Sequence, residues 1–250
     1  MKVEKISING FEPAFRGMRN AYNSWAKSDS EFLKFYKVVQ TKFKPFEEFC
    51  NDFVKVVKFD ENYKPKEDLP LLTMDLDRSF EIGPNDITLA QKLIKGGPVH
   101  SKFLRFITVT MDITAPMDFW KQYDTYKVST VSNSCSTMHT ITKEKLTLDN
   151  FGISGLRDVD IKHIQSTIDY INDHVLDNSE LSDLEKTRIC SKILPQGFEQ
   201  TRTVFLNYTT IEGMYKFRKG HTLLEWQWLC KEVFEKFPYF KEFFIDTKKE

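Results

Sequence analysis

The sequence has no excess of charge of either sign. Its 250 residues include 36 basic and 36 acidic side chains, so the formal net charge is zero. Proteins that hold duplex nucleic acid or an anionic membrane through bulk charge carry a strongly basic surface. We therefore expect neither nucleic acid nor a membrane as a partner, and any anionic ligand must be bound by a local group of cations.

Long hydrophobic runs and paired cysteines are also missing. No apolar run reaches the roughly 18 residues that a bilayer-spanning helix needs, and no cleavable apolar leader begins the chain. The four cysteines lack the Cys-x-x-Cys spacing of redox and zinc sites; they are Cys50, Cys135, Cys190 and Cys230. We expect a cytoplasmic protein with reduced thiols.

Motifs of metal and nucleotide chemistry are absent too. The chain has no glycine-rich dinucleotide or phosphate-binding loop and no His-Glu-x-x-His, and its five histidines are not at metal-ligand spacing. We expect no metal site. A lone cysteine between serines, Cys135, is more often structural than nucleophilic, and His100 and His139 are each typical of surface residues.

Apolar side chains are abundant. Hydrophobic residues make up 40% of the chain and aromatic residues 14%, including 22 phenylalanines. Such a composition excludes disorder and supports a sizeable core. The length allows one large domain or two small ones, and we predict one domain over residues 1–250.

Local patterns in the first half predict both helices and strands. The Phe-rich stretch 31–58 has a helical pattern, and the charged segment 60–70 after it is expected to be a surface loop. Residues 83–97 begin with a proline and end in Gly-Gly, which predicts a short capped helix. Alternating β-branched and polar residues predict a strand over 103–114, and Pro116 suits the first turn of a helix that follows it.

The second half is dominated by helical patterns. Spacings of three and four predict one helix with a buried stripe, formed by Ile161, Ile164, Ile168, Ile171 and Val175. Capping residues over 177–182 precede another helix that must stop near Pro195. A further helical face comprises Trp226, Leu229, Cys230, Val233, Phe234 and Phe237. Strands and long helices are interspersed, so the fold class is α/β or α+β.

The segment TVSNSCSTMH, residues 130–139, contains five hydroxyl side chains in ten positions. It has two interpretations. Such a segment can be a turn held by its own side chain to backbone hydrogen bonds. It can also wrap a phosphate or the edge of a pyrimidine with short donors.

The order of these segments resembles the flavin-dependent thymidylate synthases, the ThyX family, over roughly residues 84–235. A helix ending in Gly-Gly is followed by VHSKFLRFITVTMDITAP, FWKQY, the 130–139 segment, ILP and LNYTTIEGMYKFRKGHTLLEWQWLC. The family has a histidine turn, a strand ending in Ala-Pro, a helix with glutamine, Arg-His-Arg, a serine loop, Leu-Pro and a helix with asparagine and a distal arginine. The resemblance implies a single domain with a central, mostly antiparallel sheet and long helices.

The resemblance also implies which residues bind a pyrimidine nucleotide. Asn133 and Ser136 match residues of the family's serine loop, and Ser134 lies between them. Gln122 matches a nucleotide-binding glutamine, and Lys127 is expected to bind the nucleotide as well. Arg218, eleven residues after Asn207, matches the arginine that holds the pyrimidine. In this scheme Arg218 polarises a pyrimidine carbonyl and Ser136 orients the base, so both are expected to be catalytic.

The expected flavin contacts follow from the same comparison. Asn207 matches an asparagine that contacts flavin in the family, and its spacing from Arg218 places both on one helix face. His100, Arg105 and Tyr126 are also expected to face FAD.

The sequence departs from the family pattern where fixed positive charge is usual. Arg-His-Arg is replaced by Tyr126-Lys127-Val128, or by Thr125-Tyr126-Lys127 if the loop holds a one-residue insertion, and a lysine cannot make bidentate guanidinium contacts. Met138 and Ser191-Lys192 lie where the family has further arginines. We nevertheless expect a cationic pocket formed by Lys102, Arg105, Lys127, Lys192 and Arg218.

Two functions remain open on this resemblance. The first is an enzyme for the reductive methylation of dUMP, or a related one-carbon transfer, with FAD, NADPH and methylene-tetrahydrofolate; the cofactor supplies the chemistry and the protein orients it. The family forms homotetramers with shared sites, so a homo-oligomer is implied. The second is a non-catalytic nucleotide-binding protein, a sensor or sequestering protein, because Arg-His-Arg is lost. An accidental match to an unrelated globular protein is the third alternative, and Arg16 and Arg19 are open candidates for a site.

Overall fold

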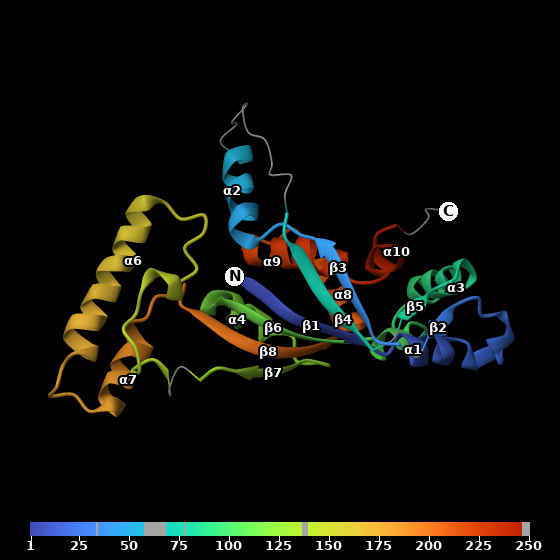
Figure 1. Cartoon of the computed structure of the whole chain (residues 1–250), viewed down its shortest axis with the longest axis horizontal. Coiled ribbons are helices and arrows are strands. Elements are labelled where there is room, and N and C mark those ends of the chain that lie inside the picture. Colours follow the sequence, from blue (N-terminus) through green and yellow to red (C-terminus); the bar gives the residue numbers. More distant parts are fainter. Residues whose placement is uncertain (34, 58–68, 78, 137–139, 247–250) are drawn as a thin grey trace.

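The structure is a computed structural model that describes residues 1–33, 35–57, 69–77, 79–136 and 140–246. A six-stranded sheet in the order β3-β4-β1-β6-β8-β7 forms its centre (Figure 1). The strands are β1 (Lys2–Asn9), β3 (Lys37–Lys42), β4 (Leu71–Leu76), β6 (Thr108–Pro116), β7 (Val131–Ser134) and β8 (Glu199–Asn207). Strand β1 pairs in parallel with β4, and the other four described pairs are antiparallel. The predicted α/β class with a mostly antiparallel sheet is confirmed.

Helices and a small second sheet complete the fold. A two-stranded sheet joins β2 (Glu31–Leu33) to β5 (Ser79–Glu81). The α-helices are α1 (Phe11–Met18), α2 (Phe46–Val57), α3 (Pro84–Lys95), α4 (Met117–Tyr123), α6 (Asp158–Ile171), α7 (Asp183–Ile193), α8 (Tyr208–Arg218), α9 (Leu224–Trp228) and α10 (Phe240–Phe244). Two π-helical segments, Asn172–Leu176 and Leu229–Val233, extend α6 and α9.

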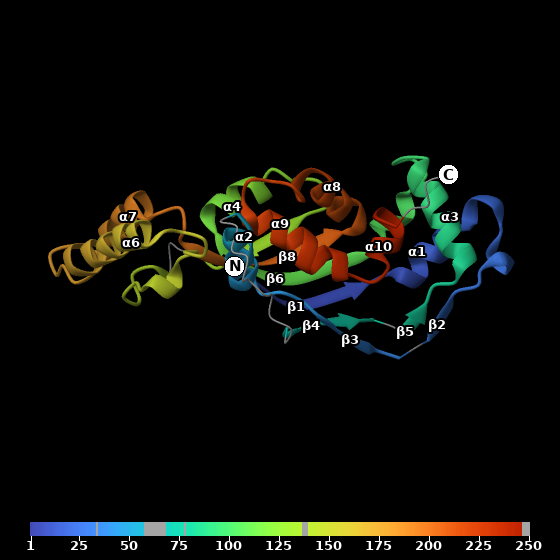
Figure 2. The ribbon, with the colours of Figure 1, turned by 90° about the horizontal axis from the view of Figure 1, so that it is seen from above.

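The core lies between one face of the large sheet and the helices that cover it. Val109, Met111 and Ile113 on β6 are buried, whereas the residues between them are only partly buried. This alternation follows from the period of two in a strand. Figure 2 shows α4, α8 and α9 together on one side of the sheet. Phe119 and Trp226 from these helices join the strand residues in one hydrophobic cluster.

A second hydrophobic cluster holds the helical extension formed by α6 and α7, which projects from one end of the molecule (Figure 1). Its buried members are Ile141, Leu146, Phe151, Ile168, Ile171, Val175 and Cys190. The predicted stripe therefore packs as core, although Ile161 and Ile164 are only partly buried. Ser182 caps α7 by accepting a hydrogen bond from the backbone N–H of Glu185, and the helix ends at Ile193, before Pro195.

The predicted helix over 31–58 is wrong in its first half. Residues 31–33 and 37–42 form β2 and β3, and the helix α2 begins only at Phe46, directly after Pro45. The segment Lys37–Lys42 contains consecutive β-branched residues that pair with β4, and proline favours the start of a helix over its interior. The helical pattern of phenylalanines thus belongs to α2 alone. The segment predicted as a loop over 60–70 lies mostly outside the described residues.

The predicted strand over 103–114 begins late. Residues 102–105 form a 3-10 turn, and β6 starts at Thr108. Phe103, Leu104 and Ile107 are all buried, whereas Arg105 and Phe106 are exposed. Burial at spacings of one, three and four is a helical pattern, so the turn buries these side chains better than a strand would. The helices predicted over 83–97 and after Pro116 are confirmed as α3 and α4.

All four cysteines lie among the described residues and are free thiols, with Cys135 exposed and the other three buried. No described helix has the length and hydropathy required to cross a membrane.

Candidate functional site

Arg218 is held in place by neutral groups from three segments. Its Nε donates to the hydroxyl of Tyr126 at 3.0 Å, and its Nη1 donates to the Oε1 of Gln122 at 3.0 Å. The guanidinium carbon lies 5.3 Å from the ring centroid of Trp226 and 5.6 Å from that of Tyr126, which is cation-π distance. We call these four residues the Arg218 cluster.

The positive charge of the Arg218 cluster is not compensated. Among the described residues, no carboxylate forms an ion pair with Arg218, and its side chain is only partly buried. Gln122 and Tyr126 use two of the five guanidinium N–H groups, so the remaining donors are available. A guanidinium fixed by uncharged partners and lacking a carboxylate suits an anionic or carbonyl-bearing ligand.

The local sequence explains why these side chains meet. Pro116 ends β6 and precedes α4, so Gln122 falls on the last turn of that helix. Asn207 caps α8, with its side-chain oxygen accepting from the backbone N–H of Thr210 at 3.0 Å. Arg218 is the last residue of α8, and a helix of this length spans about 16 Å. Asn207 and Arg218 therefore lie at opposite ends of α8.

Beside the Arg218 cluster lies a hollow of about 450 Å³, which we call the Lys127 hollow. Its lining comprises Arg105, Thr125, Tyr126, Lys127, Val128, Ser129, Thr209, Thr210 and Gly213. Tyr126 belongs to both features, because its ring lines the hollow and its hydroxyl accepts from Arg218. The exposed side chains of Arg105 and Lys127 form no ion pair with another described residue. The hollow is therefore locally cationic in a chain of zero net charge.

Within the described part of the chain, three buried polar atoms without a partner lie on the elements that carry the site. Among the described residues, three side-chain N or O atoms are buried without a hydrogen-bond partner: Tyr123 Oη, Thr209 Oγ1 and Trp226 Nε1. They belong to α4, α8 and α9, the elements around the Arg218 cluster. Burial also raises the pKa of Tyr123, which keeps its hydroxyl protonated. Because buried polar groups are normally paired, these three atoms are candidates for a hydrogen bond to a ligand or an ordered water.

Backbone strain also occurs at the hollow. Ser129 has a φ of 57°, in the left-handed region that residues other than glycine seldom adopt. The hydroxyl of Thr130 donates to the carbonyl of Tyr126 and fixes the turn that contains Ser129. Such outliers are found preferentially at functional sites.

Part of the 130–139 segment is a strand instead of a loop. Residues 131–134 form β7, an exposed edge strand paired with β8, and residues 137–139 lie outside the described residues. Asn133 pairs with Thr203 and Ser134 with Arg202, so the two side chains point to opposite faces of the sheet. Because of this pleat, β7 cannot supply both side chains to one pocket.

The structure does not bring the predicted serine loop to the Arg218 cluster within one chain. Ser136 is partly buried, and its carbonyl accepts from the hydroxyl of Thr140 at 2.9 Å. Neither the Arg218 cluster nor the Lys127 hollow includes Asn133, Ser134 or Ser136. Cys135 is joined instead to β8, through its N–H to Thr201 and its carbonyl to Gln200.

The five predicted cations are distributed over several surfaces. Arg105 and Lys127 share the Lys127 hollow, and Arg218 is joined to it through Tyr126. Lys102 and Lys192 are exposed and do not line it. His100 lines a different groove with Arg19 and Lys92. Of the predicted flavin contacts, Arg105 and Tyr126 lie together and His100 is separate from them.

Two members of the site were not predicted from the sequence. Trp226 was assigned to the core, and it is fully buried, but its ring also supports the guanidinium of Arg218. His221 follows α8 closely; burial, and then the charge of Arg218, lower its pKa. Its Nδ1 accepts from the N–H of Leu223 at 3.0 Å, as a neutral imidazole can. The dense aromatic pattern around Trp226 was the available signal, but it is indistinguishable from core packing in sequence.

A second hollow of about 300 Å³ lies where α4 meets α7. Lys121, Thr187 and Ser191 form part of its lining, together with apolar residues such as Phe198. Lys121 precedes Gln122 on α4, so neighbouring residues of one helix serve two separate sites. Ser191 belongs to the Ser191-Lys192 pair, where the resemblance leads us to expect an arginine.

Comparisons with known proteins identify the fold. No protein-family model matches the chain, and no curated protein matches it. A crystal structure of thymidylate synthase X (ThyX) from Helicobacter pylori with FAD and dUMP matches with a TM-score of 0.55 at 12% identity, covering 86% of this chain and 100% of that one. A second structure of flavin-dependent thymidylate synthase ThyX from Helicobacter pylori, also complexed with FAD and dUMP, matches with a TM-score of 0.55 at 13% identity, covering 85% and 100%.

The match covers most of this chain and the whole of the chain that it is compared with. At this low identity, fold similarity does not transfer chemistry, which must be argued from the site. The chain therefore has a ThyX-like fold, as the order of its segments predicted.

Proposed function

We propose that this chain is a flavin-dependent thymidylate synthase-like protein that acts on a pyrimidine deoxynucleotide, through reductive methylation of dUMP or a related one-carbon transfer. The observation that carries the proposal is the uncompensated guanidinium of Arg218, which Gln122, Tyr126 and Trp226 fix in position. Two further cations, Arg105 and Lys127, line the adjoining hollow. A site of this kind is suited to an anion with a polar ring. The ThyX-like fold, found in proteins crystallised with FAD and dUMP, supports the same ligands.

In this proposal Arg218 polarises a carbonyl of the pyrimidine. Its side chain is already oriented by two hydrogen bonds, so little reorganisation is needed when charge develops on the carbonyl oxygen. Gln122 holds the guanidinium and presents its amide N–H groups to the nucleotide. Tyr126 accepts from Arg218, which leaves its own proton free to be donated to the ligand.

The Lys127 hollow fits the phosphate groups of FAD. Arg105 and Lys127 supply positive charge, and Thr209 supplies a hydroxyl without a partner among the described residues. The N-terminus of α8 lies at the same place, because Thr209 and Thr210 belong to its first turn. FAD would supply the hydride chemistry, with NADPH as reductant and methylene-tetrahydrofolate as one-carbon donor; the residues of this chain bind and orient.

The proposal includes a cytoplasmic homo-oligomer, a tetramer on the family pattern. Four large apolar side chains that line the Lys127 hollow or lie close in sequence to its lining residues are more than half exposed: Phe106 (55%), Val128 (80%), Val131 (64%) and Phe217 (71%). Beside them, β7 is an exposed edge strand. Apolar patches and free strand edges are typical of surfaces that another chain covers. Assembly at this surface would allow Ser136 and Asn133 of one subunit to complete the Arg218 cluster of another.

One observation favours the second candidate, a nucleotide-binding protein without catalysis. A single lysine, Lys127, stands where the family has Arg-His-Arg. Lys127 can bind a phosphate but cannot reproduce bidentate contacts. A sensor or sequestering protein needs only this binding.

The experiment that tests the proposal is spectroscopy of the purified full-length chain. Flavin absorbance, with oxidation of NADPH that depends on added dUMP, is the result expected of the enzyme. A colourless protein whose melting temperature rises with dUMP supports the second candidate, because a ligand stabilises the state that binds it. A colourless protein with no response to dUMP contradicts both.

A charge reversal locates the binding. Lys127→Glu should weaken flavin retention by at least about tenfold, as expected for a lost charge-assisted contact. Lys162→Glu, on the exposed side of α6, is the matched control and should leave flavin content unchanged. If both variants retained flavin equally, the Lys127 hollow would not be the flavin site.

A further inference from the structure

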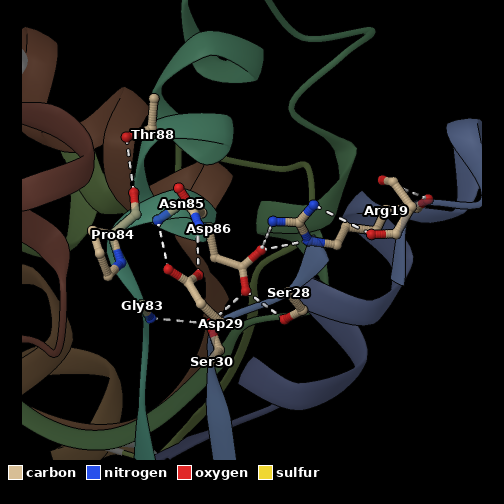
Figure 3. Close-up of polar contacts among 10 residues, drawn as sticks. Arg19, Ser28, Asp29, Ser30, Gly83, Pro84, Asn85, Asp86 and Thr88 are labelled. Atoms are coloured by element: carbon tan, nitrogen blue, oxygen red, sulfur yellow. Dashed lines mark hydrogen bonds and ion pairs between the residues drawn. The ribbon is translucent and has the colours of Figure 1, made fainter. Parts of the chain in front are cut away.

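A loop far from the Arg218 cluster has both ends bound to one buried carboxylate. The side chain of Asp86 is fully buried; its Oδ1 accepts from Nε and Nη2 of Arg19, both at 2.6 Å. Its Oδ2 accepts from the hydroxyls of Ser28 and Ser30, also at 2.6 Å each (Figure 3). Residues 20–27 lie between these anchors, and we call them the 20–27 loop. One carboxylate on α3 therefore closes this loop at both ends.

Asp29 fastens the same segment to the first turn of α3. Its carboxylate accepts from the backbone N–H groups of Asn85 and Asp86 at 2.9 and 3.1 Å (Figure 3). Burial acts to raise the pKa of Asp29, but these hydrogen bonds outweigh it and the pKa lies below its usual value. At Gly83 a Cβ atom would lie 2.2 Å from Asp29 Cγ, so only glycine permits the approach. The anchored segment thus has a defined position against α3.

This anchoring does not serve the core. A buried ion pair is costly to desolvate and adds little net stability, although it can fix one conformation. The loop that it fixes contributes no buried hydrophobic side chain: Tyr22 is 86% exposed and Trp25 is 50% exposed. Trp25 is further oriented by its indole N–H, which donates to the side-chain oxygen of Asn20 at 2.8 Å. Exposed aromatic residues held in one conformation are typical of a binding surface.

The 20–27 loop forms one wall of a groove of about 1020 Å³, and α3 forms the other; we call it the α3 groove. Its lining comprises Arg19, Tyr22, Ser24, Ala26, Lys27, Ser28, Asp29, Asn85, Leu89, Lys92, Leu93, Gly96 and His100. None of these residues lines the Lys127 hollow. The size is at the upper end of the roughly 300–1,000 Å³ typical of small-molecule sites.

The α3 groove is cationic. Arg19 is paired with Asp86, and Asp29 is engaged by two backbone N–H groups. Lys27 and Lys92 are exposed and have no ion pair with any described residue. These two lysines leave the groove surface positive in a chain whose net charge is zero. Ammonium groups of this kind serve as point charges for phosphate.

We infer that the α3 groove binds a phosphorylated ligand with a planar aromatic ring, whose phosphates meet Lys27 and Lys92 and whose ring stacks on Tyr22. The exposed ring of Tyr22 lines the same groove as both lysines, and aromatic side chains stack on bases irrespective of sequence. The pairing of Arg19 with Asp86 sets the position of the loop that carries Tyr22 and Lys27. This groove shares no lining residue with the Lys127 hollow, and the inference stands without the proposed function.

The test is calorimetric titration of the full-length chain with two probes, ATP and inorganic tripolyphosphate. Lys27→Glu/Lys92→Glu should weaken binding of both probes by at least about tenfold. Lys95→Glu is the matched control, because Lys95 lies on the same helix but outside the groove lining. It should retain the affinity of the unmodified chain. Equal losses in the two variants, or no binding of either probe at millimolar concentration, overturn the inference.

Tyr22→Ala distinguishes the ring from the phosphates. It should weaken the binding of ATP by about five- to a hundredfold, the effect of losing one stacked base. Binding of tripolyphosphate should be unchanged. ATP binding that is unaffected by Tyr22→Ala contradicts the proposed role of the ring. Flavin content and the response to dUMP, measured on the same variants, should not change, so failure here is distinguishable from failure of the proposed function.

Discussion

Two arginines of this chain are held in opposite ways. Arg19 is buried and donates to a fully buried carboxylate, Asp86, through two nitrogens. Arg218 is partly exposed and is held by an amide oxygen, a phenol and aromatic rings. Both are fixed in position, but only one retains a charge that a ligand can use.

The comparison separates an architectural cation from a functional one. Where a carboxylate cancels the charge, the arginine orders the chain around it, as Arg19 does for the 20–27 loop. Where only neutral acceptors hold the guanidinium, the orientation is fixed and the electrostatic attraction is preserved. Arg16 and Arg19 could not be distinguished from Arg218 by residue type, and this difference in partners makes the distinction.

The largest effect should come from breaking the architectural pair. Asp86→Ala leaves Arg19 buried without its partner and removes the acceptor for Ser28 and Ser30, so it should cost about 3–5 kcal/mol of unfolding free energy. Chemical denaturation measures this loss. The double variant Arg19→Met/Asp86→Leu removes both charges and should cost less than the sum of the single changes. Additive costs would show that the two residues act independently.

An intermediate effect is expected at the functional arginine, and on binding instead of stability. Arg218→Met should weaken nucleotide binding by about 1.5–3 kcal/mol, the range for a charge-assisted hydrogen bond. Its unfolding free energy should change by less than about 1 kcal/mol, because the side chain is only partly buried. Titration with dUMP and denaturation on the same sample give both values. A stability loss as large as that of Asp86→Ala would mean that Arg218, like Arg19, mainly holds the structure together.

The smallest effect concerns the neighbour of Arg218. Burial, and then the charge of Arg218, lower the pKa of His221 in the folded chain. The unfolded chain takes up this proton near pH 6.5 and the folded chain does not, so stability falls as the pH drops below about 6.5. Arg218→Gln should raise the pKa of His221 toward its usual value, as followed by NMR titration of the imidazole. An unchanged pKa would mean that burial alone lowers it.

Prolines and glycines at the ends of elements made parts of the fold predictable. Pro84 and the Gly-Gly pair mark both ends of α3, and Pro116 marks the junction of β6 and α4. In such places one residue restricts the backbone whatever its tertiary surroundings. The turn over 102–105 was missed because Phe103 and the following Ile107 have the aromatic and β-branched composition of a strand, although their burial together with Leu104 has helical spacing.

The site was predictable only in part. The order of segments identified Gln122, Tyr126 and Arg218, and the structure joins these three by hydrogen bonds. Asn133 and Ser136 remain predictions, because their approach to Arg218 requires a second subunit. The pairing of Arg19 with Asp86 joins residues 67 positions apart with no periodic pattern between them. Contacts of that kind depend on tertiary packing and leave no local signal.

The shared anchor at Asp86 has a consequence for how this chain can vary. Since Arg19 and Ser28 converge on one carboxylate, the intervening backbone starts and finishes at nearly the same point. The entropy of closing such a segment grows slowly, by about 0.6 kcal/mol for each doubling of its length. The 20–27 loop can therefore change in length and sequence without loss of the fold. Because its two ends stay anchored at Asp86, a changed loop can recognise a different ligand.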